Sequence, residues 1–158
     1  MRDPRRHLRP RIVSLLVLSV LLLSLVVPAT TAAAFKISLA RITSGLSSPT
    51  QITNAGDGTN RLFVTERRGT IRVVQNGVLK AGYFMDIRSI VSETGERGLL
   101  GLAFHPDFKT NRQLFVYYTN NGGDIVLSRY TTNVARTNVD ESLPRPLLVI
   151  EHSAQTNH

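Results

Sequence analysis

Four histidines and no cysteine limit the chemistry open to this chain of 158 residues. Without cysteine there can be no disulfide, thiolate metal ligand or cysteine nucleophile. His105 and Asp107 could form half of a metal site, but no third ligand is spaced near them. We therefore predict no metal ligands and expect a turn that Asp107 caps with its carboxylate. His152 follows a predicted strand and is expected to be a solvated loop residue, whereas His158, the last residue, shows no role from spacing alone.

Glu96 and Arg97 stand between two glycines directly ahead of the most apolar predicted strand, 99–104. At the mouth of a channel, a carboxylate and a guanidinium could hold a polar ligand by charge-assisted hydrogen bonds. The alternative is an exposed ion pair that contributes about 0–1 kcal/mol to stability. Arg67 and Arg68 lie in a predicted turn, where a charged hairpin tip is expected. The chain has no glycine-rich phosphate loop, nucleophile elbow or HExxH sequence.

Short strands and tight turns must position these residues. After residue 34, Val, Ile and Thr make up 31 of 124 residues, and all eleven glycines lie there. β-branched residues favour strands, and Gly beside Asn or Asp favours turns. No segment in this part sustains the apolar spacing of an amphipathic helix over three turns. The sequence therefore predicts an all-β protein.

The predicted strands form two groups of four antiparallel strands, near 50–87 and 98–151. Each group spans about forty to fifty residues, the size of a propeller blade. A weak repeat supports this interpretation, because NRLFV at 60–64 resembles NRQLFV at 111–116. The expected strands are 50–54, 61–66, 70–75, 81–87, 98–104, 113–119, 125–131 and 147–151, with a further alternating run at 35–42. A jelly roll or sandwich is the structural alternative.

Two blades alone leave sheet edges and a face uncovered, whereas a propeller closes a ring of typically four to eight blades. We therefore expect residues 35–158 to be the N-terminal part of a longer propeller domain.

Residues 1–34 have the pattern of a secretory signal peptide. Five arginines precede a run of Ile, Val, Leu and Ser at 12–27, and Ala32-Ala33-Ala34 follows. Cleavage is expected after Ala34, or failing that after Ala33. The alternative is an uncleaved anchor, although sixteen residues span only about 24 Å of a membrane core of about 30 Å. The protein is accordingly expected to be exported to the periplasm, the cell surface or the medium.

The charge of +8 does not indicate a nucleic-acid partner. The first 34 residues hold five arginines and one acid, and the remaining basic residues are scattered, mostly singly. No basic stripe with interleaved aromatic residues is present to follow a phosphate backbone.

Three sequence blocks, in order, resemble the glucose/sorbosone dehydrogenase family: LFVTERRGTIRV at 62–73, GERGLLGLAFHPDF at 95–108 and LSRY at 127–130. The resemblance covers about 41–158 and about the first third of the family's six-bladed propeller. It implies an aldose dehydrogenase that passes hydride from the anomeric carbon to pyrroloquinoline quinone (PQQ), with calcium and an external electron acceptor. Because the family includes hedgehog-interacting proteins, the alternative is a secreted, non-catalytic propeller that binds a protein or glycan.

The resemblance also implies site residues. His158 matches the family's catalytic base, and Asn157 occupies a position that helps to orient it. Glu96 matches a position that contacts cofactor and substrate. In the family's glucose oxidisers this residue is Gln, so the Glu found here leaves the sugar undetermined. Arg97 is adjacent. The resemblance places the family's remaining PQQ and calcium ligands in later blades, so this chain alone is not expected to bind the quinone or turn over.

Overall fold

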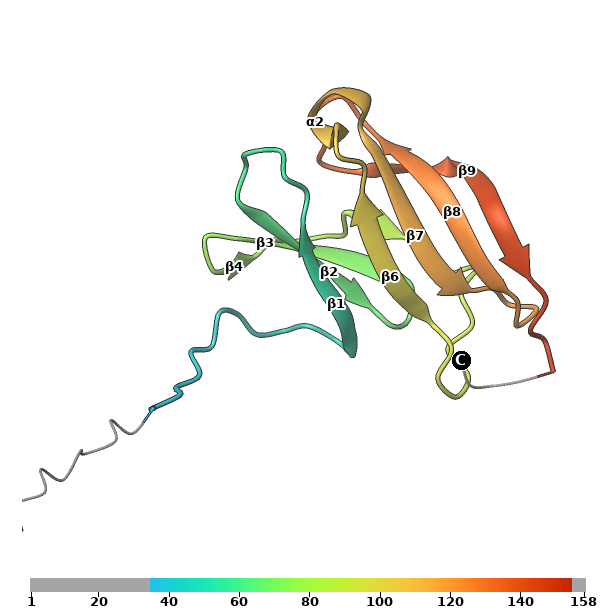
Figure 1. Cartoon of the computed structure of the whole chain (residues 1–158), viewed down its shortest axis with the longest axis horizontal. Coiled ribbons are helices and arrows are strands. Elements are labelled where there is room, and N and C mark those ends of the chain that lie inside the picture. Colours follow the sequence, from blue (N-terminus) through green and yellow to red (C-terminus); the bar gives the residue numbers. More distant parts are fainter. Residues whose placement is uncertain (1–34, 155–158) are drawn as a thin grey trace, which may run out of the picture. The chain divides into compact units, whose positions relative to one another are not determined.

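The computed structural model describes residues 35–154, and residues from Ala40 on form a compact unit of their own. Figure 1 shows this unit as two antiparallel sheets that follow one another along the chain. The elements are β1 (Pro49–Asn54), β2 (Arg61–Glu66), β3 (Thr70–Gln75), β4 (Val78–Leu79), β5 (Met85–Asp86), β6 (Leu99–Phe104), α2 (Phe108–Asn111), β7 (Gln113–Thr119), β8 (Ile125–Thr132) and β9 (Val139–Ile150).

The alternating run at 35–42 forms no strand, contrary to the expectation, and its Phe35, Ile37 and Leu39 side chains are exposed. Alternation favours a strand only where a neighbouring strand accepts its backbone hydrogen bonds.

The first sheet has the order β1-β2-β3-β4, and β5 also pairs with β3. Val74 of β3 pairs with Leu79, and Ile71 pairs with Met85, so β4 and β5 together fill the fourth position. The predicted continuous strand at 81–87 is therefore wrong in its first half. Gly82 has a φ of 76° there, which fits a turn between the two short strands.

The second sheet has the order β6-β7-β8-β9, and its first three strands match the prediction closely. The fourth strand was expected at 147–151, but β9 begins at Val139 and contains Pro144 and Pro146. Proline cannot donate to a ladder and is confined to edge strands. β9 is such a strand, and all of its residues after Val139 are exposed.

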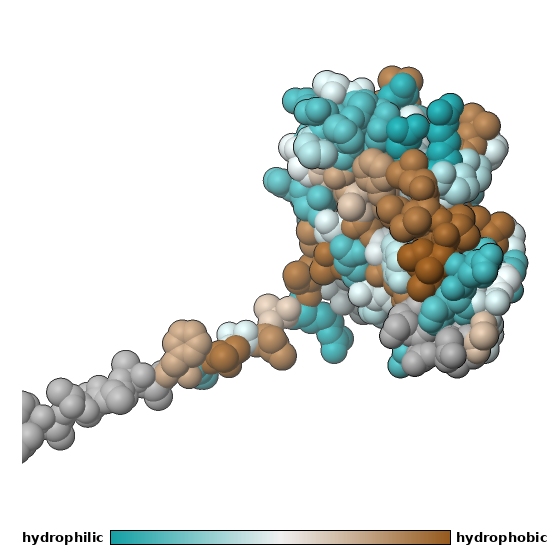
Figure 2. All heavy atoms as spheres, turned by 45° about the vertical axis from the view of Figure 1, so that its right-hand side comes forward, coloured by the Kyte–Doolittle hydropathy of each residue, from teal (hydrophilic) through white to brown (hydrophobic). Residues whose placement is uncertain are grey.

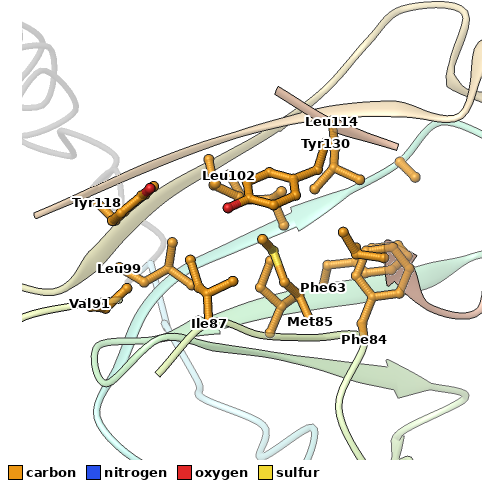
Figure 3. Packing of buried hydrophobic residues seen from close by; sticks show 14 of the residues in the cluster. Phe63, Phe84, Met85, Ile87, Val91, Leu99, Leu102, Leu114, Tyr118 and Tyr130 are labelled. Carbon is orange, nitrogen blue, oxygen red and sulfur yellow. The ribbon is translucent and has the colours of Figure 1, made fainter. Parts of the chain in front are cut away.

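One apolar core joins the two sheets. Figure 3 shows Phe63, Phe84 and Met85 of the first sheet and its loops facing Leu114 and Tyr130 of the second. The ring of Phe104 lies 4.7 Å from that of Phe63 and 4.6 Å from that of Phe108, measured between centroids. The short helix α2, which the sequence did not predict, therefore serves to bury Phe108.

Segment 40–48 crosses the other face of the first sheet. The Ser47 amide donates to the buried Glu66 carboxylate, and a Cβ on Gly45 would lie 3.4 Å from Leu79. Val64 and Val74 on this face are both 2% exposed. The side of the molecule that carries β9 is less covered, and Figure 2 shows an apolar area there. Five exposed apolar residues belong to β9: Leu143, Leu147, Leu148, Val149 and Ile150.

The two sheets are consecutive blades of a partial β-propeller. In each sheet the main strands pair with their neighbours in sequence, as in a blade, whereas a jelly roll requires Greek-key crossings. The first strands of the two sheets, β1 and β6, lie side by side. Apart from α2, the described chain is all-β, as predicted.

Candidate functional site

Three segments meet at the end of the second sheet where β6 and β8 begin and β7 and β9 end. They are the loop 93–98, the turn 120–124 and the segment 151–154. The Thr119 amide donates to the Gly98 carbonyl at 2.9 Å, and the His152 amide donates to Asp124 Oδ1 at 3.3 Å. This end of the sheet therefore carries Glu96 and Arg97 together with the chain that leads to residues 157 and 158.

Arg97 points into the protein. It is 9% exposed, and its Nη2 donates to the Ser153 carbonyl at 3.1 Å. The guanidinium lies against Gly123, where an added Cβ would be 2.6 Å from Nη2. Glu96 is exposed, and no ion pair joins these two described residues. The expected exposed ion pair is therefore wrong, because one charge is buried in the scaffold and the other faces solvent, and the ligand-binding role of this loop stays a prediction.

Arg67 connects the first blade to this loop. Its Nη1 donates to the Gly95 carbonyl and, at 3.3 Å, to the Glu93 carbonyl, while its own carbonyl accepts from Leu99 N at 2.8 Å. A Cβ on Gly98 would lie 2.6 Å from that carbonyl oxygen. The expected hairpin turn is confirmed at 67–69, but only Arg68 is exposed there, and the role of Arg67 as a positioning residue was missed by sequence reasoning.

Strand β1 holds the beginning of β6 through side chains. Thr50 Oγ1 donates to the Leu99 carbonyl at 2.8 Å. The Gln51 side-chain amide donates to the Leu102 carbonyl at 3.1 Å and accepts from Leu102 N at 2.6 Å. The strand that follows Glu96 is thus anchored to the first blade along half of its length.

A second polar cluster lies beyond the other end of β1. Asp57 accepts hydrogen bonds from Thr59 and from Arg61 Nη2 at 2.8 Å, and Arg136 Nε lies 3.7 Å from its carboxylate. Arg61 Nη1 also donates to the Arg136 carbonyl at 2.7 Å, which ties the first blade to the β8–β9 loop. Burial disfavours the charged carboxylate, but these hydrogen bonds outweigh it and lower the pKa of Asp57. A groove of about 430 Å³ beside this cluster is lined by Arg61, Tyr83 and Asn138, among others, and does not include Glu96.

The histidines of the described part do not form a metal centre. His105 Nδ1 accepts from Asp107 N at 3.0 Å and lies 4.0 Å from the Asp107 carboxylate. Asp107 precedes α2 but caps it without its side chain, contrary to the expectation, and its carbonyl accepts from Thr110 and Asn111 instead. Within residues 35–154, no three His, Cys, Asp or Glu side chains are grouped as a metal site would need. His152 is half-buried rather than solvated.

Asn157 and His158 lie outside the described residues, as does the proposed signal segment 1–34. Their assignments stay predictions. Between residues 35 and 154, the structure contains no helix that is long and apolar enough to span a membrane.

The fold is similar to part of sugar dehydrogenases of known structure. The PQQ-bound aldose sugar dehydrogenase of Streptomyces coelicolor matches 70% of this chain with a TM-score of 0.58 and 23% identity. A putative oxidoreductase (glucose dehydrogenase) of Thermus thermophilus matches 70% with a TM-score of 0.58 and 28% identity. The chain spans 33% and 31% of these proteins, respectively.

The model of the Glucose / Sorbosone dehydrogenase family matches residues 46–153, and the chain belongs to this family. Among curated relatives, Hedgehog-interacting protein of Mus musculus is 40% identical over 85 residues, and the human protein is 40% identical over 86. Each match covers 51% of this chain and only 12% of the relative. The resemblance deduced from the three sequence blocks is thereby confirmed.

Proposed function

We propose that this chain is the N-terminal part of an exported aldose dehydrogenase that oxidises the anomeric hydroxyl of a sugar with PQQ as the hydride acceptor. One observation carries the proposal. In a chain of this family, Arg97 joins the loop of Glu96 to the segment that leads to Asn157 and His158. Arg97 and Ser153, which are far apart in sequence, are thereby brought to one end of one sheet, and this supports an active site at that end.

Each predicted site residue has a defined part in this proposal. His158 takes the proton of the anomeric hydroxyl, because an imidazole with a pKa of about 6.5 accepts protons near neutral pH. Asn157 orients the imidazole. Glu96, exposed at the start of β6, accepts hydrogen bonds from sugar hydroxyls.

The described residues do not by themselves fit PQQ. When bound, PQQ would supply a two-electron acceptor, but it carries three carboxyl groups and needs cationic partners. At this end of the sheet, Arg67 and Arg97 donate to backbone carbonyls, while Glu96 and Asp124 are acidic. Ligands for the quinone and for calcium must therefore come from elsewhere in the complete protein.

The decisive experiment uses the full-length protein, supplied with PQQ and calcium, an artificial electron acceptor and a panel of aldoses. We expect reduction of the acceptor, and we expect His158→Ala to lower turnover by about 10²–10⁴-fold. His105→Ala is the matched control and should leave turnover unchanged, because His105 contacts Asp107 and Phe115 instead. Wild-type turnover in the His158 variant would refute the assignment of the base.

The second candidate is a non-catalytic propeller that binds a protein or glycan. Two observations favour it: the 40% identity to Hedgehog-interacting protein exceeds the 19–28% identity to the dehydrogenase structures, and Glu96 departs from the glutamine of glucose oxidisers. Interferometry with immobilised full-length protein would measure partner binding directly. Saturable binding of a hedgehog-type ligand without sugar oxidation would favour this function over the first.

We further propose that residues 1–34 direct export, which places an enzyme of this type where an external electron acceptor can reach it. Sequencing the N-terminus of the protein recovered from its host tests this proposal. A mature protein that starts at Phe35 supports cleavage after Ala34. An intact Met1 start in the membrane fraction would instead support an anchor.

A further inference from the structure

We propose that Arg97 and Asp124 form a positioning pair that fixes the backbone at His152 and Ser153, and so determines where the chain that follows enters the site. The anchoring stands on contacts between described residues. Its consequence for catalysis rests on the proposed function, because the proposed base, His158, follows Ser153 by five positions.

The two contacts act on opposite groups of adjacent residues. Asp124 Oδ1 accepts from the His152 amide at 3.3 Å, and Arg97 Nη2 donates to the Ser153 carbonyl at 3.1 Å. One donor and one acceptor of the backbone are thus held from two different loops. The anchored segment directly follows β9, whose last residue Ile150 pairs with Ile125 of β8, so the two contacts extend the restraint of the backbone beyond the end of the ladder.

Both side chains are themselves held in place. Asn120 Nδ2 donates to Asp124 Oδ2 at 3.4 Å, and the Asp124 amide donates to Asn120 Oδ1 at 2.9 Å, so the carboxylate is held within its own turn. Gly123, with a φ of 93°, leaves the space that the Arg97 guanidinium occupies. A buried guanidinium that donates to a carbonyl is a stronger restraint than a neutral hydrogen bond on the surface.

The pair also couples the two parts of the proposed site. Glu96 and Arg97 are neighbours in one loop, so the loop that presents the Glu96 carboxylate to solvent also holds Ser153. A shift of this loop would therefore move both the Glu96 carboxylate and the backbone at Ser153, and misplacement by about 1 Å can lower a rate about 100-fold.

The anchoring is tested without any activity, by hydrogen exchange in this chain. Arg97→Ala should speed exchange of the amides at 152–154 by about tenfold, while core amides in β7 keep their protection. Gly123→Ala is a second variant that keeps the arginine but fills its space, and it should give the same local effect. Arg68→Ala is the matched control, because Arg68 is exposed. Unchanged exchange at 152–154 in both test variants would overturn the anchoring.

The catalytic consequence is tested in the full-length enzyme. Arg97→Ala should lower kcat by about 10–100-fold with KM changed much less, and added guanidinium should restore part of that loss. Added guanidinium should not restore His158→Ala. If exchange rises at 152–154 but kcat is unchanged, the positioning role fails while the anchoring stands. If the wild-type enzyme oxidises no aldose, the proposed function fails, and the exchange experiment still decides the anchoring.

Discussion

The side-chain amide of Gln51 pairs with both backbone groups of Leu102, as a neighbouring strand would. Its Oε1 accepts from Leu102 N at 2.6 Å, and its Nε2 donates to the Leu102 carbonyl at 3.1 Å. β6 is the first strand of its sheet, so no strand of that sheet pairs with this edge. A single side chain therefore satisfies the edge and joins the two blades.

Replacing Gln51 by Met, which has a similar shape but no amide, should lower the free energy of unfolding by about 1–3 kcal/mol. The reason is that Leu102 N and O lose their partner at a half-buried position. Urea denaturation measures the change. Gln113→Met serves as control, because Gln113 uses only its backbone in the hydrogen bonds of the described chain outside the ladder: its N donates to Asn111 Oδ1 and its carbonyl accepts from His105 N. Equal stability of the two variants would show that water replaces the Gln51 amide.

Replacing Gly98 by Ala should destabilise the chain by about 1–3 kcal/mol, because the new Cβ would overlap the Arg67 backbone. Gly122→Ala is the control, since the three atoms nearest to a Cβ there are side-chain atoms of Asn120 and Asp124, the nearest at 3.2 Å, and not backbone. Thermal unfolding compares the two variants. A Gly98→Ala protein as stable as the Gly122→Ala protein would mean that the contact between Arg67 and loop 93–98 is loose.

From the Asp57 cluster we predict that the free energy of unfolding falls in acid. The pKa of Asp57 is lower in the folded state than in the unfolded state, where it is about 3.9. The carboxylate therefore contributes its full stabilisation above about pH 3.9, and this stabilisation is lost as the pH falls through the folded pKa. At pH 7, Asp57→Asn should cost about 1.5–3 kcal/mol, the usual value of hydrogen bonds to a charged group. Unfolding free energies measured from pH 7 to pH 2 should show the variant and the wild type converging below about pH 4. A constant difference across that range would contradict the prediction.

From Tyr130 we predict that the free energy of unfolding also falls in alkali. Burial, with a smaller effect of Tyr118, raises the pKa of Tyr130 well above its ordinary value. Below about pH 10 the phenol is neutral in both states and folding carries no penalty from its ionisation. Above that pH the unfolded phenol ionises while the folded one stays neutral, so the free energy of unfolding falls as the pH rises. Tyr130→Phe should remove this alkaline loss while Tyr83→Phe, at a 40% exposed residue, should not. Denaturation between pH 8 and pH 11 measures it, and identical pH profiles for both variants would be evidence against the prediction.

Local patterns were sufficient to predict most of the fold. Strands β2, β3 and β7 lie where alternation and flanking turn residues predicted them. β9 was predicted too short because Pro144 and Pro146 argue against a strand, and only the finished sheet shows that this strand is at the edge, where proline is tolerated. β4 was missed and β5 was predicted too long for a similar reason, since both short strands depend on β3 for their hydrogen bonds.

The site was less accessible to sequence reasoning because its supporting contacts are long-range. Arg97 contacts Ser153 and Arg67 contacts Gly95, and neither pair is close in sequence. The signal that could have revealed them was Gly98 and Gly123, small residues at positions where a charged side chain lies close by. The position of Glu96 between two glycines made it a candidate, but only the family resemblance gave it a role toward cofactor and substrate, and its exposure fits a residue that meets a ligand.

The exposed strand β9 bears on how the protein avoids self-association. A long, apolar edge invites the same edge of another copy to pair with it, which leads to lateral growth of sheets and to precipitation. Pro144 and Pro146 each remove one hydrogen-bond donor from the middle of this strand, and Asp140, Glu141 and Arg145 add charge. The two prolines that obscured the strand in the sequence thus make it a poor template for aggregation, and they protect the chain while its apolar surface is still uncovered.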